Sequence, residues 1–236
     1  MKNLLFAISI FSFTLAHTQT VDEIIQNYSN AMGGLENFNK LKSLKLTGTV
    51  TSQGLDLPMT VHIINNKAMR TDVDVMGQKI VNCYKEGKGW KINPFAGAAN
   101  ATDVTGTELS DFKSQSMLAS QLMDYKARGH QVELAGDEDV EGIKTNKIKL
   151  TSKDDGKVTT YFISKENNML VKSISTREIQ GQEFEIETFF SNYKDFNGFK
   201  FAMTRTQKVE GEVFQEVNYD GVELNVAIDE KMFEKG

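Results

Sequence analysis

The sequence predicts a mainly β protein of the α+β class, with one antiparallel sheet curled into an incomplete barrel. From Ser43 onward apolar and polar residues alternate with a period of two, which is typical of strands with one buried face. Turn signals such as Asn65-Asn66 and Asn197-Gly198 recur between these stretches at near-even spacing. We count about ten or eleven strands, mostly joined by hairpins, and a series of this length favours closure toward a barrel.

The first 19 residues have the pattern of a secretory signal peptide. Lys2 gives a positive start, and Leu4 to Leu15 is a mostly apolar run, too short for the ~20 residues of a membrane span. Polar residues follow, so we expect cleavage within residues 16–19; a buried N-terminal helix is the alternative. No later segment approaches 18 consecutive apolar residues. The sequence therefore predicts an exported protein that does not span a membrane, with residues 20–236 forming a single domain.

Helical spacing of apolar residues interrupts the strand pattern in a few places. Residues 21–32 carry an amphipathic repeat that Gly33-Gly34 ends, and residues 35–41 suggest one further turn. A second stretch, from Glu108 to Tyr125, fits one or two amphipathic helices better than a strand. We expect the small, polar residues 94–107 before it to form a loop, and residues 229–233 to form one helical turn.

The charge balance and the reactive residues exclude several functions. The net charge is −5, so no basic excess exists to bind the phosphates of nucleic acid. The chain has three histidines and one cysteine, Cys83, and neither zinc-ligand spacing nor a nucleophile motif. The pair Asp72 and Asp74 and the cluster Asp137-Glu138-Asp139 could hold calcium or form an acid–base pair, but solvated strands and turns explain them at least as well. We therefore predict no catalytic residues, no metal, no cofactor and no enzymatic activity.

Several segments together resemble the LolA family of periplasmic lipoprotein carriers. The stretch from Gly87 to Phe95 is similar to the Gly-Lys-x-x-Trp-x-x-x-Asn-Pro-Phe stretch of that family, with the spacing from Trp90 to Asn93 one residue shorter here. The strand Lys67 to Asp72 contains an arginine after an apolar residue, as in the family, and residues 222–233 resemble its C-terminal ending. These segments occur in the family's order and span nearly the whole of residues 20–236.

The resemblance implies a fold and a cargo. LolA-like proteins are incomplete antiparallel barrels in which helices form a lid over an apolar cavity that holds the acyl chains of lipoproteins. By resemblance Arg70 is the lid gate, so we expect Arg70→Lys to weaken closure; in the alternative, Arg70 simply pairs with Asp72. Ten methionines and fifteen phenylalanines would suit such a cavity, as they would an ordinary core. Alternation and resemblance together select the candidate lipid-binding residues Leu46, Ile63, Met69, Trp90, Phe95, Leu118 and Met123.

We expect a periplasmic carrier, a chaperone for the sorting of lipoproteins or lipids toward the outer membrane. Its partners would be acylated lipoprotein or lipid cargo and, transiently, membrane-bound transfer proteins. The alternative is a periplasmic sensor or regulatory binding module with a LolA-like fold, because such domains also occur in stress-signalling proteins. An enzyme remains a third hypothesis, which would require His62, Asp72 and Asp74 to converge in an enclosed pocket.

Overall fold

One antiparallel sheet contains all the strands of the described residues. The structure is a computed structural model that describes residues 19–179 and 182–235, so the predicted signal peptide, apart from Gln19, lies outside the described residues. Thirteen strands pair within these residues in the order β6-β5-β4-β3-β2-β1-β13-β12-β11-β10-β9-β8-β7. They are β1 (Ser43–Ser52), β2 (Leu55–Ile64), β3 (Ala68–Val75), β4 (Gln78–Lys85), β5 (Lys88–Asn93), β6 (Ala98–Val104), β7 (Gln131–Val140), β8 (Ile143–Thr151), β9 (Val158–Ser164), β10 (Leu170–Ile179), β11 (Gln182–Phe196), β12 (Phe199–Val209) and β13 (Glu212–Leu224).

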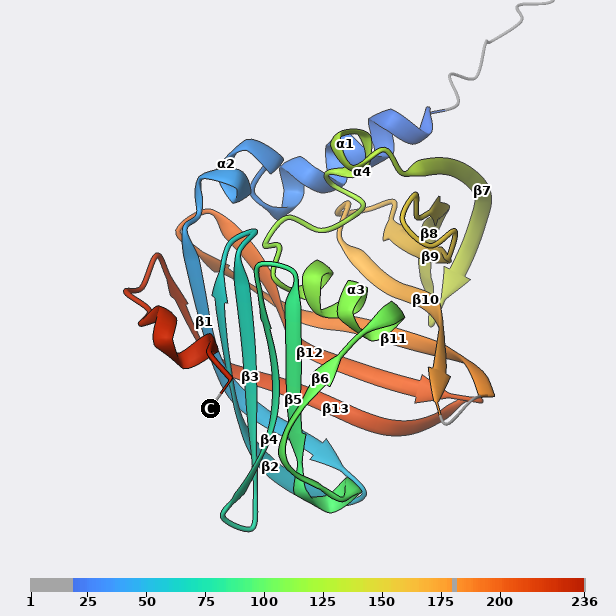
Figure 1. Cartoon of the computed structure of the whole chain (residues 1–236). Coiled ribbons are helices and arrows are strands. Elements are labelled where there is room, and N and C mark those ends of the chain that lie inside the picture. The colour runs from blue at the N-terminus through green and yellow to red at the C-terminus, as the bar shows by residue number, and fades with distance from the viewer. Residues whose placement is uncertain (1–18, 180–181, 236) are drawn as a thin grey trace, which may run out of the picture.

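The sheet is open, and this confirms the predicted incomplete barrel. Every pair of neighbouring strands follows in sequence except β1 and β13, which join the two halves of the sheet with Leu44 opposite Leu224. The two edge strands are therefore β6 and β7, and the sheet curves around a concave face (Figure 1). The chain crosses from one edge to the other through two short helices, α3 (Gly106–Gln115) and α4 (Tyr125–Arg128). We call residues 106–128 the lid segment.

The N-terminal helix forms as its sequence predicts. Helix α1 (Val21–Met32) begins at a capping box, in which the Thr20 hydroxyl accepts a hydrogen bond from the Glu23 amide and the Glu23 carboxylate accepts one from the Thr20 amide. It ends at Gly33, whose φ of 123° suits glycine, and a Cβ there would lie 2.6 Å from the Gly198 carbonyl oxygen. That close approach seats α1 against the β11–β12 turn. Helix α2 (Leu35–Lys40) follows directly.

Two apolar clusters fill the concave side. The larger one joins α1, α2 and the end of the lid segment to inward-facing residues of β8, β9 and β10, including Ile148 and Ile163, which are fully buried. The smaller one joins α3 to β1, β2, β3, β4 and β6. Figure 1 shows α3 lying within the curve of the sheet and α1, α2 and α4 across one end of it. No helix in the described part of the chain is long and apolar enough to cross a membrane.

The convex side is covered by the C-terminal turn. The predicted helical turn forms there as η2 (Glu230–Phe233), and Phe233 packs against Ala68, Val81, Cys83 and Trp90 in a third apolar cluster. Cys83 is fully buried in that cluster, as expected of a core cysteine. The turn is thus separated from the lid segment by the full thickness of the sheet.

One local prediction was wrong. Residues 94–107 were expected to form a loop, but most of them form strand β6. Only the turn η1 (Pro94–Ala96) and residues near Thr105 remain outside it. The small polar residues of β6 form a strand because they pair with β5. The acidic cluster Asp137-Glu138-Asp139 lies on the edge strand β7, in agreement with the expected explanation by a solvated strand. There Lys165 and Lys147 pair with Asp137 and Glu138, which explains the cluster as a charged strand edge.

Candidate functional site

Three of the expected lipid-binding residues meet on the concave face. Leu46, Ile63 and Met69 lie on neighbouring strands, where Ile63 is directly opposite Met69 and both belong to the smaller apolar cluster with Leu46. Their side chains are 6%, 8% and 1% exposed, respectively. The inward alternation of β1, β2 and β3 therefore produces a continuous apolar wall, and α3 covers it.

The lid segment is held mainly by apolar contacts. Phe112 of α3 is buried within the smaller cluster, Met123 belongs to the larger cluster, and Leu118 packs against both. Leu118 and Met123, two further candidates, therefore lie on the lid and face the apolar interior. The concave face is thus occupied by the protein's own side chains, and the two described hollows, about 320 Å³ each, lie at the margin of the larger cluster.

A few polar contacts fix the lid segment at its middle and its ends. The β2–β3 turn holds the residues after α3: Asn65 Oδ1 accepts from the Leu118 amide at 3.0 Å, and the Asn66 amide donates to the Ser116 carbonyl at 2.9 Å. The start of α3 is tied by an ion pair between Lys91 and Glu108 at 2.7 Å. Tyr125 and Lys126 of α4 both bond to Asp22 of α1. Most of these contacts are partly exposed, so each contributes little to holding the segment.

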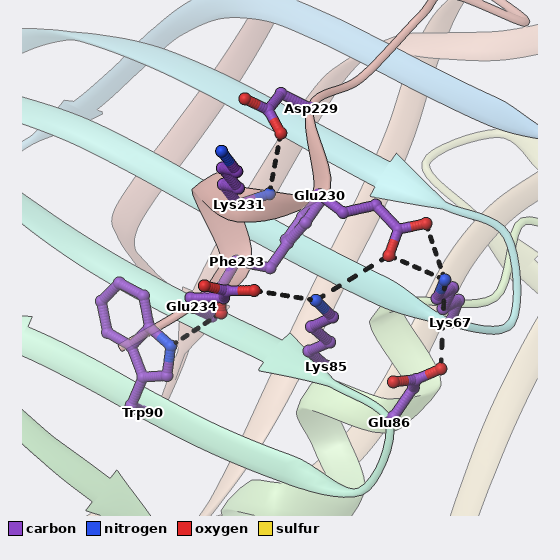
Figure 2. Close-up of polar contacts among 10 residues, drawn as sticks. Lys67, Lys85, Glu86, Trp90, Asp229, Glu230, Lys231, Phe233 and Glu234 are labelled. Atoms are coloured by element: carbon purple, nitrogen blue, oxygen red, sulfur yellow. Dashed lines mark hydrogen bonds and ion pairs between the residues drawn. The ribbon is translucent and has the colours of Figure 1, made fainter. Parts of the chain in front are cut away.

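Trp90 lies on the opposite face from the expected cavity. Its indole Nε1 donates to the Phe233 carbonyl oxygen at 3.1 Å, and its side chain is 7% exposed under the C-terminal turn. Figure 2 shows this bond beside the ion pairs of Lys67 and Lys85 with Glu230 and of Lys85 with Glu234. Trp90 is therefore part of the packing of the C-terminal turn.

Arg70 also faces the convex side. Its guanidinium forms a bidentate pair with Asp72 at 2.8 and 2.9 Å, donates to the Met232 carbonyl at 2.6 Å and lies 5.6 Å from the centre of the Trp90 ring. Bonding to Asp72 raises the pKa of Arg70 above its already high value. These bonds join β3 to the C-terminal turn and not to the lid segment. The arrangement matches the alternative in which Arg70 pairs with Asp72, and a gate role would require different contacts.

The remaining candidates do not form a site. Phe95 is 55% exposed in η1, at the end of the sheet. His62 lies opposite Arg70 on the convex face, where desolvation lowers its pKa, and Asp74 accepts from the Gly77 amide at the β3–β4 turn. His62, Asp72 and Asp74 line neither described hollow. The described residues contain no group of three or more side chains that could hold a metal ion.

One of the two hollows is a polar pocket that the sequence interpretation missed. It lies between α3 and the β9–β10 side of the concave face, at the mouth between lid segment and sheet. Its charged lining includes Lys113 and Asp111 of α3, Lys157 before β9 and Arg177 of β10. A signal was present: Ser173, Ser175 and Arg177 occupy the alternate positions at which an apolar inner face would be expected.

Comparison with solved structures identifies the architecture. A LolA superfamily protein from Nitrosomonas europaea superposes with a TM-score of 0.60 at 12% identity, over 92% of this chain and 99% of that one. The chain has the LolA-like fold. A putative outer membrane lipoprotein-sorting protein domain from Vibrio parahaemolyticus matches it with the same TM-score at 13% identity, over 92% of this chain and 96% of that one.

The LolA-like fold is shared more widely. A DUF1329 family protein from Desulfovibrio piger also has a TM-score of 0.60, at 14% identity over 92% of this chain and 98% of that one. No family profile and no curated protein matches the sequence. At these identities the likeness establishes the fold, and the function must be argued from the concave face itself.

Proposed function

We propose that the protein is a periplasmic carrier that binds the acyl chains of lipoproteins or lipids on its concave face, for transfer toward the outer membrane. The observation that carries this proposal is the lid segment. It covers the apolar wall formed by β1, β2 and β3, and it is held there mainly by apolar contacts. The LolA-like fold, shared with a putative lipoprotein-sorting domain, supports the same conclusion.

Binding would exchange one set of apolar contacts for another. Each methylene removed from water contributes about 0.8 kcal/mol, so one acyl chain supplies roughly 10 kcal/mol before ordering costs. Leu109, Phe112 and Leu118 already shield the wall, so a chain must take their place and gains only the difference. A small difference suits a carrier, because cargo that binds by displacing the lid is released when the lid returns. No empty cavity is needed in the closed state.

The test is native mass spectrometry of the protein purified from the periplasm of its host, followed by organic extraction and uptake of a fluorescent fatty acid. Two variants on β2 form a matched pair. Val61→Glu changes a residue on the concave side that packs against the smaller apolar cluster, and Ile64→Glu changes one on the convex side. Both side chains are half-buried, so both substitutions have a similar cost in stability. Thermal melts establish that each variant is folded.

We expect acylated peptide or lipid to accompany the wild-type protein and the Ile64→Glu variant, and to be lost from Val61→Glu. A protein that carries no lipid and takes up no fatty acid would overturn the carrier proposal. Equal loss from both folded variants would also contradict it, because the convex face would then matter as much as the concave one.

A further inference from the structure

The polar pocket is connected to the apolar interior. Tyr161 of β9 lines the pocket and also packs against the larger apolar cluster, and Met117 of the lid segment lies on the pocket's other side. The pocket measures about 320 Å³. A molecule that entered between α3 and β10 would therefore meet a polar chamber first and apolar side chains beyond it. That order of surfaces fits an amphiphile with its polar end at the mouth.

Three cations in this pocket have no partner among the described residues. Lys113, Lys157 and Arg177 form no ion pair or side-chain hydrogen bond with any other residue in the described part of the chain. The other two basic groups differ. Arg128 bonds to Asp124 and to the Ala119 carbonyl, and His130 accepts the Lys153 amide on Nδ1. Other exposed lysines, such as Lys79 and Lys231, also have no ion pair among the described residues, so the distinguishing feature of this group is its position around one pocket.

The pocket also holds carboxylates that do not neutralise these cations. Asp111 of α3 lies on the opposite side from Lys157 and Arg177, and both cations act on it electrostatically without forming an ion pair. Partial desolvation nevertheless raises the Asp111 pKa above its usual value. Asp154 and Asp155 line the pocket at the β8–β9 turn, where Asp155 accepts the Lys157 amide. Charges of both signs thus line both sides of the hollow, with Lys113 two residues from Asp111 on α3 and Asp155 two residues from Lys157 at the β8–β9 turn.

We propose that this pocket binds a zwitterionic phosphate-ester headgroup, that of a phospholipid bearing a primary amine, and so sets the orientation of the cargo. Arg177 and Lys157 bind the phosphate, for which the guanidinium fork and the ammonium are suited. Asp111, across the pocket, accepts the amine. Hydroxyl groups of Ser110, Thr159 and Ser175 line the same space and offer further hydrogen bonds. This inference rests on the proposed function, because it adds the headgroup to the acyl chains already considered.

The charges favour a zwitterion over a simple anion or cation. A purely anionic ligand would leave Asp111 facing negative charge at close range, and a purely cationic one would leave Arg177 and Lys157 unmatched. A ligand that carries both charges satisfies both sides of the pocket at once. Such a ligand spans the pocket from β9 and β10 on one side to α3 on the other.

The experiment measures affinities of short-chain lipids for the full chain by isothermal titration calorimetry. The probes are dihexanoyl phosphatidylethanolamine, dihexanoyl phosphatidic acid and dihexanoylglycerol, each used below the concentration at which it forms micelles, and free phosphoethanolamine. We expect the ethanolamine lipid to bind about tenfold or more tightly than dihexanoylglycerol, as charge-assisted hydrogen bonds predict. The double variant Arg177→Gln/Lys157→Gln should lose that advantage and keep its affinity for dihexanoylglycerol.

Two further variants make the test specific. Lys79→Gln/Lys231→Gln changes the net charge equally at exposed positions outside the pocket, and it should bind like the wild type. Asp111→Asn should weaken binding of the ethanolamine lipid and leave binding of phosphatidic acid unchanged or stronger. A merely structural role of Asp111 would affect both lipids alike.

The outcomes separate this inference from the carrier proposal. Equal affinity for the ethanolamine lipid and dihexanoylglycerol would overturn the headgroup site and leave the carrier intact. If phosphoethanolamine bound as tightly as the whole lipid and dihexanoylglycerol did not bind, the natural ligand of the pocket would be a free phosphate ester. That result would overturn the proposal that the ligand is a lipid. Loss of affinity in the Lys79→Gln/Lys231→Gln control equal to that in the pocket variant would also overturn it.

Discussion

Truncation of Phe112 to alanine should open the lid segment without unfolding the sheet. Phe112 is 5% exposed and is the one fully buried side chain of α3, where it packs into the smaller apolar cluster with Leu46 and Met69. Removing the ring deletes the main apolar contact between α3 and the wall of strands. The sheet itself keeps its hydrogen bonds and its other contacts.

The size of the effect follows from the buried area. A phenylalanine buries about 200 Å², and at about 25 cal/mol per Å² its burial contributes roughly 5 kcal/mol. Measured Phe→Ala substitutions in cores cost about 3–5 kcal/mol, which agrees with this estimate. A loss of this size exceeds what a short helix gains from its remaining contacts, so α3 should undock locally before the protein unfolds.

The assay combines hydrogen exchange with uptake of a fluorescent fatty acid. A loss of about 3–5 kcal/mol predicts that amide exchange in residues 106–128 rises by a factor of about 100 or more. Exchange in β1 to β4 should change little. Fatty-acid affinity should rise, since the ligand no longer has to displace the docked helix. Phe233→Ala is the matched control: Phe233 is also buried, at 1% exposure, but it packs on the convex face. It should destabilise the protein without strengthening uptake.

Either of two results would refute this reasoning. If exchange rose equally in the lid segment and in the central strands, α3 would be part of one cooperative core and not a separate cover. If Phe112→Ala left α3 undocked but bound fatty acid no better than the wild type, the wall beneath α3 would not be the binding surface.

Three other substitutions or reactions test separate contacts. Gly89→Ala places a Cβ 2.8 Å from Leu109 Cδ1, so it should cost about 1–3 kcal/mol in urea denaturation and loosen α3, and the added Leu109→Ala should restore docking. Arg70→Gln should raise hydrogen exchange in residues 229–235 and not in the lid segment, whereas a gate role predicts the reverse. Burial raises the pKa of the Cys83 thiol to about 12, so thiolate is scarce at pH 8; iodoacetamide should label the folded protein slowly, and faster once residues 229–235 are deleted.

Local pattern was enough to predict much of the fold. The amphipathic repeat of α1, the hairpin turns and the final turn before Glu234 form where the sequence predicts them, because each depends on residues a few positions apart. Strand β6 was missed for the opposite reason. Its small polar residues have little strand preference of their own, and pairing with β5 supplies the hydrogen bonds that make it a strand.

The candidate site divides in the same way. Strict alternation along β1, β2 and β3 was sufficient to bring Leu46, Ile63 and Met69 to one face, since successive side chains of a strand point to opposite sides. Alternation does not say which face is concave at Trp90 and Arg70, and both turned out to lie under the C-terminal turn. The polar pocket was missed because its charges come from four separate stretches of chain.

The sequence by itself therefore determined a mainly β chain, its hairpins and its helices, because these follow from periodicity and turn chemistry over short distances. Only the tertiary structure decided that Arg70 bonds to the Met232 carbonyl, 162 residues away, and that Asp111 faces Arg177 across a pocket. The physical reason is the joining of β1 to β13 and the curvature of the sheet, which assign an inside and an outside to every strand. No local pattern contains that assignment.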